Sequence, residues 1–498
     1  MNKIEVNGYY LDEQQTKIVL DESQSLLVVA GAGSGKSLTI VGKVKYLIES
    51  KRIAPNEILC ISFTNDSTRS LKDKLCEYDV DIFTFHKLGL KILQKSNLQY
   101  EVCSSDYLEF VVHEFLVGIV LENKFIMNKI LRYFNIYCFF KIEEKYKKLL
   151  NTKYKEIISF EKLIVKFIRL YKTNGYNFSH FYSCFNKTIK YKERLFLLIT
   201  LNIYLIYIND LASSGLIDFD DMLIKSRKVV ETNKINLKYK YIIIDEYQDT
   251  SYIRFLLIKS IMDKTGAKFM AVGDDFQSIY RFNGCDLRIF TNFLEFFPRA
   301  NILKIEKTYR NSQQLIDIAG NFVMQNKNQL RKKLISDKYI TNPIVICYYS
   351  DIKKDFEKLI NKINGNIMIL GRNNKDINLI INENIILDNN NLVYKKDPNI
   401  SFEFYTVHRS KGLEADNVIV LNLIDDNLAF PNKIENNKVL RFVMNDKGSC
   451  LLDEERRLFY VALTRTKNKV YLFTKKNKES IFIKELIKKY DVEIINIK

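Results

Sequence analysis

The sequence predicts an α/β protein with two parallel-sheet domains and an all-helical insertion in the first of them. Apolar runs that are typical of buried strands end in polar residues, first at Leu27–Ser37 and again at Tyr241–Asp245. A Lys-rich and aromatic-rich stretch of helical periodicity separates these two runs, and a second alternation of strands and helices starts near Ala300. Such alternation is typical of parallel sheets covered by helices.

Composition limits the class of protein. The 498 residues suffice for about two to four domains. Hydrophobic residues make up 47% and charged residues 27%, which indicates a soluble globular chain. No uninterrupted apolar run approaches a membrane span, and the N-terminus shows no secretion signal. We therefore expect a cytoplasmic protein that is not associated with a membrane.

Cysteine usage and charge add two further expectations. The eight Cys form no CxxC pair and only four His occur, which argues against structural zinc and favours reduced thiols. The net charge of +18 suits a polyanionic partner such as nucleic acid. A chain-wide abundance of Lys, Ile, Asn and Tyr explains the same charge, so both interpretations remain open at this point.

The stretch Leu27–Ser37, LVVAGAGSGKS, places small residues between an apolar strand and a helix. Small residues let backbone N–H groups close around phosphate oxygens at a helix N-terminus, whose dipole favours anions. Lys36 would reach the β- and γ-phosphates of a nucleotide, and Ser37 would hold Mg²⁺. A chance Gly-rich turn is the alternative, but strand, loop, Lys-Ser and helix follow in the right order. The predicted cradle comprises Ala30, Gly31, Ala32, Gly33, Ser34 and Gly35.

Carboxylates follow another predicted strand of the first domain. Asp245 and Glu246 end the apolar run YIII, where one carboxylate can hold Mg²⁺ and its neighbour can activate water. Gln277 follows the strand Phe269–Val272 and could contact the γ-phosphate. Gln15 precedes the phosphate loop, and its amide could bind an adenine edge, although most glutamines are surface residues.

Aromatic and polar residues follow the remaining strands. The strand Glu57–Phe63 runs into Thr64, and the strand Val80–Thr84 runs into His86, at the edge where α/β sheets bind ligands. Tyr280 and Phe282 lie beyond Gln277, and their rings could stack on nucleic-acid bases. Ordinary packing of an aromatic pair is the alternative.

The second domain shows short strands near Ile344, Ile367, Phe402 and Val418, and a loop is expected in the Asn-rich stretch 382–391. A final helix carries EERRLFY and leads to Arg465. In the helical insertion, Gly175 is the expected break, and the aromatic residues are expected to form its core.

Nine ordered motifs carry a resemblance to the UvrD/Rep family of superfamily 1 helicases, and within it they look most like the DNA helicase IV branch. The resemblance spans residues 11 to about 475. The motifs are AGAGSGKS, FTN, TFH, DFDDM, DEYQD, GDDFQSIYRFNG, TYRNS, VHRSKGLEADNVIVL and EERRLFYVALTRTK.

The resemblance implies two RecA-like motor domains with ATP between them. Residues 1–88 and 214–298 would form the first motor domain, 89–213 the helical insertion, and 299–498 the second motor domain. The implied catalytic residues are Lys36, Glu246, Gln277, Arg310 and Arg465. Gln15 and Tyr309 would contact adenine, Glu414 the ribose, and Ser37 and Asp245 the Mg²⁺. For DNA, the implied contacts are Phe63, Thr64, His86, Tyr280, Phe282, Thr406 and His408.

The resemblance implies an ATP-dependent 3′-to-5′ DNA helicase and single-strand translocase, acting in DNA repair, recombination or replication. Its partners would be single-stranded and tailed duplex DNA, and the chain would be a monomer in isolation. One alternative is a non-processive translocase that remodels protein–DNA complexes or drives a nuclease partner, for example in defence. Another is a nucleotide-switched scaffold without turnover, against which the presence of Glu246, Arg310 and Arg465 argues.

Three positions depart from the pattern of the family. Leu38 stands where many relatives have an Arg that stacks on adenine, so base selectivity is expected to be looser. Phe282 replaces the common Trp and offers a smaller stacking face. The stretch between Arg372 and Thr406 is short, so the large insertion of Rep and UvrD is expected to be missing from the second motor domain.

Overall fold

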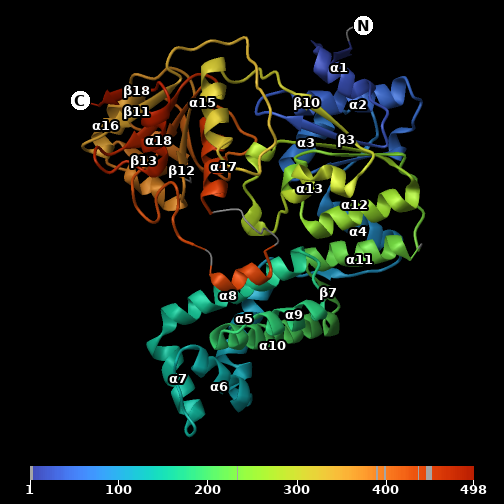
Figure 1. Cartoon of the computed structure of the whole chain (residues 1–498), viewed down its shortest axis with the longest axis vertical. Helices are drawn as coiled ribbons and strands as arrows, with labels where there is room; N and C mark the ends of the chain where they lie inside the picture. The colour runs from blue at the N-terminus through green and yellow to red at the C-terminus, as the bar shows by residue number, and fades with distance from the viewer. Residues whose placement is uncertain are drawn as a thin grey trace.

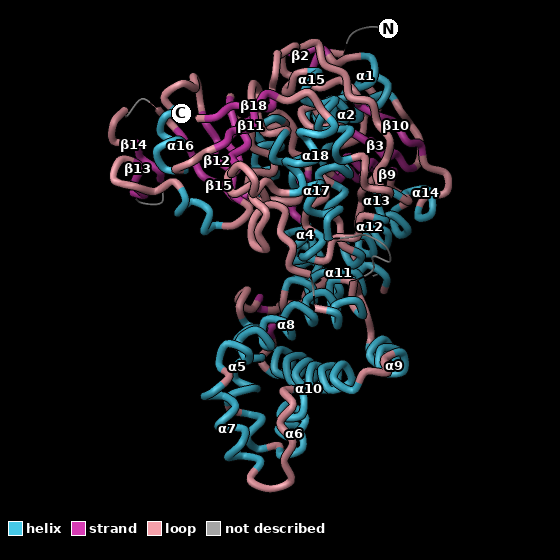
Figure 2. The backbone as a smooth tube through the Cα atoms, turned by 60° about the vertical axis from the view of Figure 1, so that its left-hand side comes forward, coloured by secondary structure: helices cyan, strands magenta, loops and turns pink. Residues whose placement is uncertain are grey.

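The computed structural model describes residues 4–232, 234–388, 391–397, 400–435, 437–444 and 451–497. Two α/β domains lie side by side, and a helical domain projects from the first of them (Figures 1 and 2). Each α/β domain contains a six-stranded, fully parallel sheet, as the sequence predicts. The fold class is therefore confirmed.

The first sheet is a continuous wall of apolar strands. All six residues of β3 and all five of β4 are buried, which is typical of parallel strands covered on both faces. The strand order is β10-β3-β9-β8-β4-β5. The strands are β3 (Ser25–Ala30), β4 (Ile58–Ser62), β5 (Asp81–Thr84), β8 (Tyr241–Ile244), β9 (Lys268–Gly273) and β10 (Asn301–Ile305).

Helices cover both faces of this sheet, and side chains cap several of their N-termini. Asp12 and Gln15 form a capping box on α1, and the Thr64 and Thr84 side chains cap the two helices that follow β4 and β5. The helices are α1 (Glu13–Leu20), α2 (Lys36–Glu49), α3 (Asn65–Lys74), α4 (Phe85–Lys95), α11 (Phe219–Glu231), α12 (Tyr252–Thr265), α13 (Arg288–Thr291) and α14 (Phe293–Phe296). Short 3-10 turns are η1 (Pro55–Glu57), η3 (Tyr247–Asp249), η4 (Asp275–Gln277) and η5 (Arg281–Asn283).

Two of the domain boundaries expected from the sequence need correction. The strand β10 follows residue 299 but pairs with β3, so it belongs to the first sheet rather than to the second motor domain. The helix α4 crosses residue 89, and its Leu88, Ile92 and Leu93 pack in the core beneath the first sheet. The helical domain therefore begins after α4.

The helical domain has its own apolar core, in which Phe160, Phe167, Phe196 and Tyr171 are buried. Gly175 adopts a φ of 65° just after α8, at the predicted break. The helices are α5 (Tyr107–Val117), α6 (Lys124–Tyr133), α7 (Ile142–Thr152), α8 (Tyr154–Thr173), α9 (Phe178–Lys187) and α10 (Tyr191–Ser213), with η2 (Ile119–Glu122) and the strand pair β6 (Glu101–Val102) and β7 (Leu216–Ile217).

One helix among the described residues, α10, is long and apolar enough by length and composition to cross a membrane, which the sequence analysis did not expect. The helix α10 contacts α5, α6, α8 and α9, and residues along its length are buried among them. Its apolar character therefore has a structural explanation as the central helix of this domain.

The second sheet has the order β15-β12-β16-β17-β11-β18. Its strands are β11 (Ile344–Tyr348), β12 (Ile367–Gly371), β15 (Phe402–Thr406), β16 (Asn417–Val420), β17 (Val470–Thr474) and β18 (Glu493–Asn496). The strands expected near Ile344, Ile367, Phe402 and Val418 are thus confirmed. The helices are α15 (Gln313–Val323), α16 (Ile352–Ile360), α17 (Leu451–Leu463) and α18 (Ile481–Lys489), with η6 (Asn374–Leu379) and η7 (Lys438–Phe442).

Part of the Asn-rich stretch expected to be a loop is instead a strand. β13 (Ile385–Asp388) pairs antiparallel with β14 (Asn391–Tyr394), and residues 389–390 lie outside the described part of the chain. Ile385 is fully buried against the second sheet, and this apolar contact outweighs the turn tendency of the surrounding Asn residues. A small additional hairpin, β1 (Glu5–Val6) with β2 (Tyr9–Tyr10), packs on α2 near Gly42.

Candidate active site and strand interface

The loop between β3 and α2 is shaped for a close approach to the segment that follows the first sheet. Gly33 and Gly35 adopt φ values of 69° and 77°, which favour glycine. A Cβ at Gly33 would lie 2.5 Å from the Cβ of Arg310. The Thr308 hydroxyl donates to the Ala32 carbonyl at 2.7 Å, and the Tyr309 N–H donates to the Gly33 carbonyl at 2.9 Å. The loop is therefore held against the residues that lead into the second motor domain.

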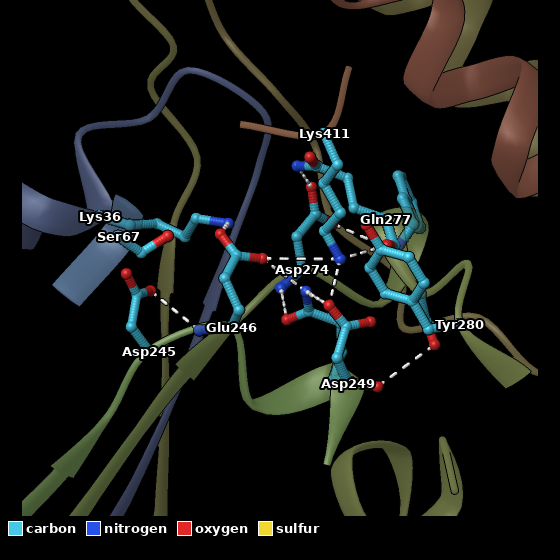
Figure 3. A network of polar contacts seen from close by, with 12 residues as sticks. Lys36, Ser67, Asp245, Glu246, Asp249, Asp274, Gln277, Tyr280 and Lys411 are labelled. Carbon is cyan, nitrogen blue, oxygen red and sulfur yellow. Dashed lines mark hydrogen bonds and ion pairs between the residues drawn. The ribbon is translucent and has the colours of Figure 1, made fainter. Parts of the chain in front are cut away.

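The first residue of α2, Lys36, is paired with the carboxylate predicted to act as a base. Lys36 Nζ lies 2.9 Å from Glu246 Oε1 (Figure 3). Burial lowers the pKa of Lys36, but the carboxylates of Glu246, Asp274 and Asp245 outweigh it and raise the pKa. Burial raises the pKa of Glu246, but Lys36 and Lys411 outweigh it and hold the pKa well below its usual range. Both groups are therefore charged at neutral pH.

Asp245 occupies a different electrostatic environment from its neighbour. Burial and then the Glu246 carboxylate raise the pKa of Asp245 to about 6. Asp245 Oδ1 accepts a hydrogen bond from the Glu246 N–H at 2.9 Å (Figure 3). The backbone of Glu246 adopts a φ of 51°, a conformation that non-glycine residues rarely take and that is often retained at functional sites.

The donor set fits a magnesium–nucleotide complex. Ser37 is the second residue of α2, and Asp245 is half-buried and has no partner among the described ion pairs. No group of three or more His, Cys, Asp or Glu in the described residues could hold a metal ion alone. Mg²⁺ in such sites takes one or two protein oxygens and completes its shell with phosphate and water. Ser37 and Asp245 therefore fit a Mg²⁺ ion that is bound together with the phosphates of a nucleotide.

Lys411 was not among the predicted site residues, although it lies within the predicted motif VHRSKGLEADNVIVL. Its Nζ donates to the Gln277 carbonyl at 2.8 Å, lies 3.8 Å from Glu246 Oε2, and forms an ion pair with Asp249 (Figure 3). Since Lys411 comes from the second motor domain, it links that domain to the carboxylates of the first. Only its basic character within the motif could have indicated this role.

Arg465 and Gln277 meet across the two motor domains. Arg465 Nη2 donates to Gln277 Oε1 at 3.0 Å, and Gln277 Nε2 donates to Asp274 Oδ2 at 2.6 Å. Arg465 is only 1% exposed. Burial and then the neighbouring Arg310 lower the pKa of Arg465 to about 9, so this side chain remains charged at neutral pH. Two arginines that repel each other in a buried place are suited to an anionic ligand, which would relieve the repulsion.

Arg310 and Glu414 form a second contact at the same boundary. Arg310 Nε donates to Glu414 Oε2 at 2.7 Å, and Lys467 Nζ lies 3.2 Å from the other carboxylate oxygen. Glu414 is therefore held between two cations in this conformation. Its predicted ribose contact would have to replace or share these partners.

The predicted adenine contacts gather around the first helix. The Gln15 amide donates to the Ser34 carbonyl at 3.3 Å and its oxygen accepts from the Asp12 N–H at 3.1 Å. The Tyr309 hydroxyl donates to Asp12 Oδ2 at 2.9 Å, and the Tyr309 ring is 56% exposed. Gln15 and Tyr309 thus share Asp12, which places the amide and the open ring at one end of the phosphate loop.

Four of the predicted DNA contacts form one row of rings. Phe63 and Tyr280 are parallel, with an interplanar angle of 6° and ring centroids 6.3 Å apart. Tyr280 and Phe282 are 6.1 Å apart, and Phe282 lies 5.3 Å from His408 of the second motor domain. The Tyr280 hydroxyl also donates to the His408 carbonyl at 3.0 Å. The row therefore crosses both motor domains.

The other three predicted DNA contacts lie apart from this row. His86 contacts Phe219 at a ring distance of 4.8 Å. The Thr64 hydroxyl caps α3, and Thr406 is the last residue of β15, where its carbonyl accepts from the Ser410 N–H. The structure does not give the Thr64 or Thr406 side chain a contact with the row.

A cavity of about 760 Å³ extends from the row to the helical domain. The first motor domain contributes His86, Phe219, Arg254 and Phe282 to its wall. The facing wall comes largely from α8, which contributes Lys162, Lys166 and Arg169 together with Glu161, while Lys172 at its end is buried in ion pairs. Rings on one side and cations on the other match the two needs of a single-stranded nucleic acid, which are base stacking and phosphate neutralisation.

The two histidines of this surface give a pH prediction. Burial lowers the pKa of His86 to about 4, with a further contribution from Arg254, and burial lowers the pKa of His408 to about 4. An unfolded histidine titrates near pH 6.5, so the unfolded chain binds more protons between these values. Stability is therefore expected to fall as the pH drops from 6.5 towards 4. The melting temperature of His86→Gln should fall less over this interval than that of the wild type, whereas equal slopes would contradict the assignment.

The model of the UvrD/REP helicase N-terminal domain matches residues 11–298, and the model of the UvrD-like helicase C-terminal domain matches residues 372–477. The chain is 24% identical to DNA helicase IV of Escherichia coli (strain K12), over 98% of this chain and 72% of that protein.

Two further relatives are longer proteins that the chain covers only in part. It is 28% identical to a probable DNA helicase II homolog of Mycoplasma capricolum, over 68% of this chain and 44% of that protein. It is 29% identical to the ATP-dependent DNA helicase Rep of Buchnera aphidicola subsp. Acyrthosiphon pisum, over 68% of this chain and 48% of that protein. The chain thus spans less than half the length of these two relatives.

Proposed function

We propose that this chain, which belongs to the UvrD/Rep helicase family, is an ATP-driven motor that moves 3′ to 5′ along single-stranded DNA and unwinds duplex. Membership is shown because the N-terminal family model alone matches residues 11–298, more than half of the chain. The observation that supports the activity is the contact of Arg465 with Gln277, which brings a buried cation of one motor domain to the predicted nucleotide site of the other.

The pairing of Lys36 with Glu246 suggests how binding prepares hydrolysis. A phosphate in the loop would compete with Glu246 for the Lys36 ammonium, because both partners are anions and the ammonium is the first group of α2. Once Lys36 leaves, the pKa of Glu246 rises back towards its usual value. Glu246 then becomes a better general base for the attacking water. Lys36 therefore couples occupancy of the loop to activation of the base.

The second motor domain would supply the charge that the reaction needs. Arg310 and Arg465 would face negative charge that develops on the phosphate oxygens, and a rigid, always charged guanidinium suits this task. When bound, ATP with Mg²⁺ would supply the bond between the β- and γ-phosphates that hydrolysis breaks. Ser37 and Asp245 would hold the metal. Because Arg465 lies across the domain boundary from the phosphate loop, closure of the domains and hydrolysis would occur together.

DNA would lie along the aromatic row and under the helical domain. The rings of Phe63, Tyr280 and Phe282 could stack on bases of any sequence, which suits a motor that moves along an arbitrary strand. His86 and His408 would remain neutral near pH 7 and act as flat surfaces rather than as phosphate contacts. Lys162, Lys166 and Arg169 of α8 would follow the phosphate backbone.

A substitution in the row tests this placement. Phe282→Ala removes a ring that is 42% exposed. Loss of one stacked base is expected to weaken single-strand binding by about 1–3 kcal/mol. Fluorescence anisotropy with a labelled oligonucleotide measures this change. Phe125→Ala, which removes a ring that is 60% exposed in the helical domain, is the control that should bind normally. An unchanged affinity in Phe282→Ala would contradict the stacking role.

A polarity assay tests the function as a whole. The protein should separate duplexes that carry a 3′ single-stranded tail, in an ATP-dependent reaction, and should leave 5′-tailed duplexes intact. Separation of the 5′-tailed substrate alone would contradict the proposed direction. The absence of both unwinding and DNA-stimulated hydrolysis would contradict the function.

A second candidate is a translocase that displaces proteins or serves a partner instead of opening long duplexes. The observation that favours it is the short connection between β12 and β15, whose described residues form only η6 and the β13–β14 hairpin. ATP hydrolysis that is stimulated by single-stranded DNA, without unwinding of duplex DNA, would support this candidate over the first if the protein also displaces a bound protein from DNA.

A further inference from the structure

A segment of the second motor domain leaves its own sheet and docks on the helical domain. We call residues 437–444, which include η7, the docking strap. The strap lies in the chain between β16 and α17 of the second sheet. Figure 1 shows this orange-red segment lying on the helical domain beside α8. The strap thus connects the second motor domain to the helical domain.

The docking strap is built into the helical core. Val439, Leu440 and Val443 are at most 5% exposed and belong to the same apolar cluster as Phe167 and Phe196 of the helical domain. Burial of three aliphatic side chains stabilises the contact through the hydrophobic effect. The docking strap is therefore part of the core of the helical domain.

Polar groups fix the position of the docking strap. Arg441 donates to both oxygens of Glu193, with Nη1–Oε1 at 2.9 Å and Nη2–Oε2 at 2.6 Å. The Asn174 amide donates to the Val443 carbonyl at 2.8 Å, and His180 Nε2 lies 2.6 Å from the Phe442 carbonyl. A bidentate guanidinium–carboxylate pair of which Glu193 is 8% exposed is a specific contact.

The same end of α8 is also attached to the first motor domain. Lys172 Nζ lies 2.8 Å from Asp221 Oδ1 and also pairs with Asp218, and the Lys172 side chain is 3% exposed. A Cβ at Gly284 would lie 2.5 Å from Thr173 Cγ2, so the Thr173 side chain packs directly on the backbone of Gly284. Lys172 and Thr173 therefore hold the first motor domain, and Asn174, the next residue, holds the second.

The helical domain is consequently a bridge between the two motor domains, separate from the nucleotide site. The cavity proposed for the strand lies between α8 and the first motor domain. We propose that this bridge limits how far the motor domains separate when no nucleotide joins them, and that Arg441 and Glu193 are positioning residues that keep the motor closed around single-stranded DNA between rounds of hydrolysis. This inference rests on the proposed function.

Two variants release the docking strap in different ways. Arg441→Glu places two carboxylates together, and Glu193→Gln keeps the shape of the side chain while removing its charge. Dissociation from a labelled single-stranded oligonucleotide, measured without nucleotide, should be about tenfold faster in Arg441→Glu and change in the same direction, but less, in Glu193→Gln. Lys438→Glu is the matched control, because it changes the charge of the exposed strap residue next to the same interface without removing the pair.

Steady-state kinetics separates positioning from a general loss of structure. The DNA concentration that half-saturates ATP hydrolysis should rise about tenfold in Arg441→Glu, while kcat at saturating DNA stays within about twofold. Equal dissociation rates in the wild type and both variants would overturn the proposed role of the docking strap. A fall of kcat in parallel with DNA affinity would also overturn it. A wild-type protein without DNA-stimulated hydrolysis would overturn the proposed function instead, while the nucleotide-free dissociation rates still test the strap.

Discussion

Arg465→Ala should reduce the kcat of ATP hydrolysis by about 10³–10⁵-fold, the range that arginine fingers contribute in phosphoryl transfer. The side chain is 1% exposed, and Nη2 donates to Gln277 Oε1 at 3.0 Å. Nucleotide affinity should fall much less, because Lys36 and the loop of the first motor domain remain. Steady-state hydrolysis, together with binding of a fluorescent ATP analogue, measures the two effects separately.

Arg465→Lys distinguishes charge from geometry. Lys keeps a positive charge but lacks the planar fork, so its kcat should lie between those of the wild type and Arg465→Ala. Arg465 Nε also donates to the Val461 carbonyl at 3.0 Å, so a melting curve must accompany each variant. Normal hydrolysis by a folded Arg465→Ala protein would contradict the two-domain site.

Lys36→Ala should abolish measurable ATP hydrolysis while single-stranded DNA still binds. Removal of one preorganised charge at a reacting phosphate costs about 10²–10³-fold in rate, and loss of phosphate affinity adds to this. The variant also leaves Glu246 without its partner at 2.9 Å. Hydrolysis assays at high ATP concentration and DNA anisotropy measure the two outcomes.

The control for this prediction lies on the same helix. Lys45 of α2 pairs with Glu77 at 3.6 Å, away from the phosphate loop, so Lys45→Ala should hydrolyse ATP normally. Wild-type turnover in Lys36→Ala would contradict the assignment of the loop. Loss of DNA binding in the same variant would contradict the separation of the two sites.

The local elements were predictable because their signals are local. The apolar run before Gly31 predicts β3, the small residues predict the loop, and the carboxylates after YIII mark the end of β8. The aromatic row was predictable in part, since Phe63, Tyr280 and His408 each follow a strand or a recognisable motif. Fold class and family resemblance are confirmed, whereas the roles of the individual site residues stay proposals.

The contacts that join distant segments were not predictable from one sequence. Lys411 pairs with Asp249 and lies near Glu246 only because the two motor domains meet there. The sequence around these three residues carries no signal for that contact. β10 joins the first sheet because its pairing with β3 is decided by tertiary packing. The docking strap is a further case, since Arg441 and Glu193 are far apart in the chain and lie in different domains.

The central claim is that a DNA strand held beside the boundary of the two motor domains stimulates ATP hydrolysis at that boundary. The most direct test is the steady-state hydrolysis rate of the wild-type protein with Mg²⁺, measured with and without a single-stranded oligonucleotide, and repeated with Phe282→Ala. A rate that rises severalfold with the oligonucleotide, and a higher half-saturating DNA concentration in the variant, are the predicted results. Hydrolysis that is absent, or that is identical with and without DNA, would contradict the claim.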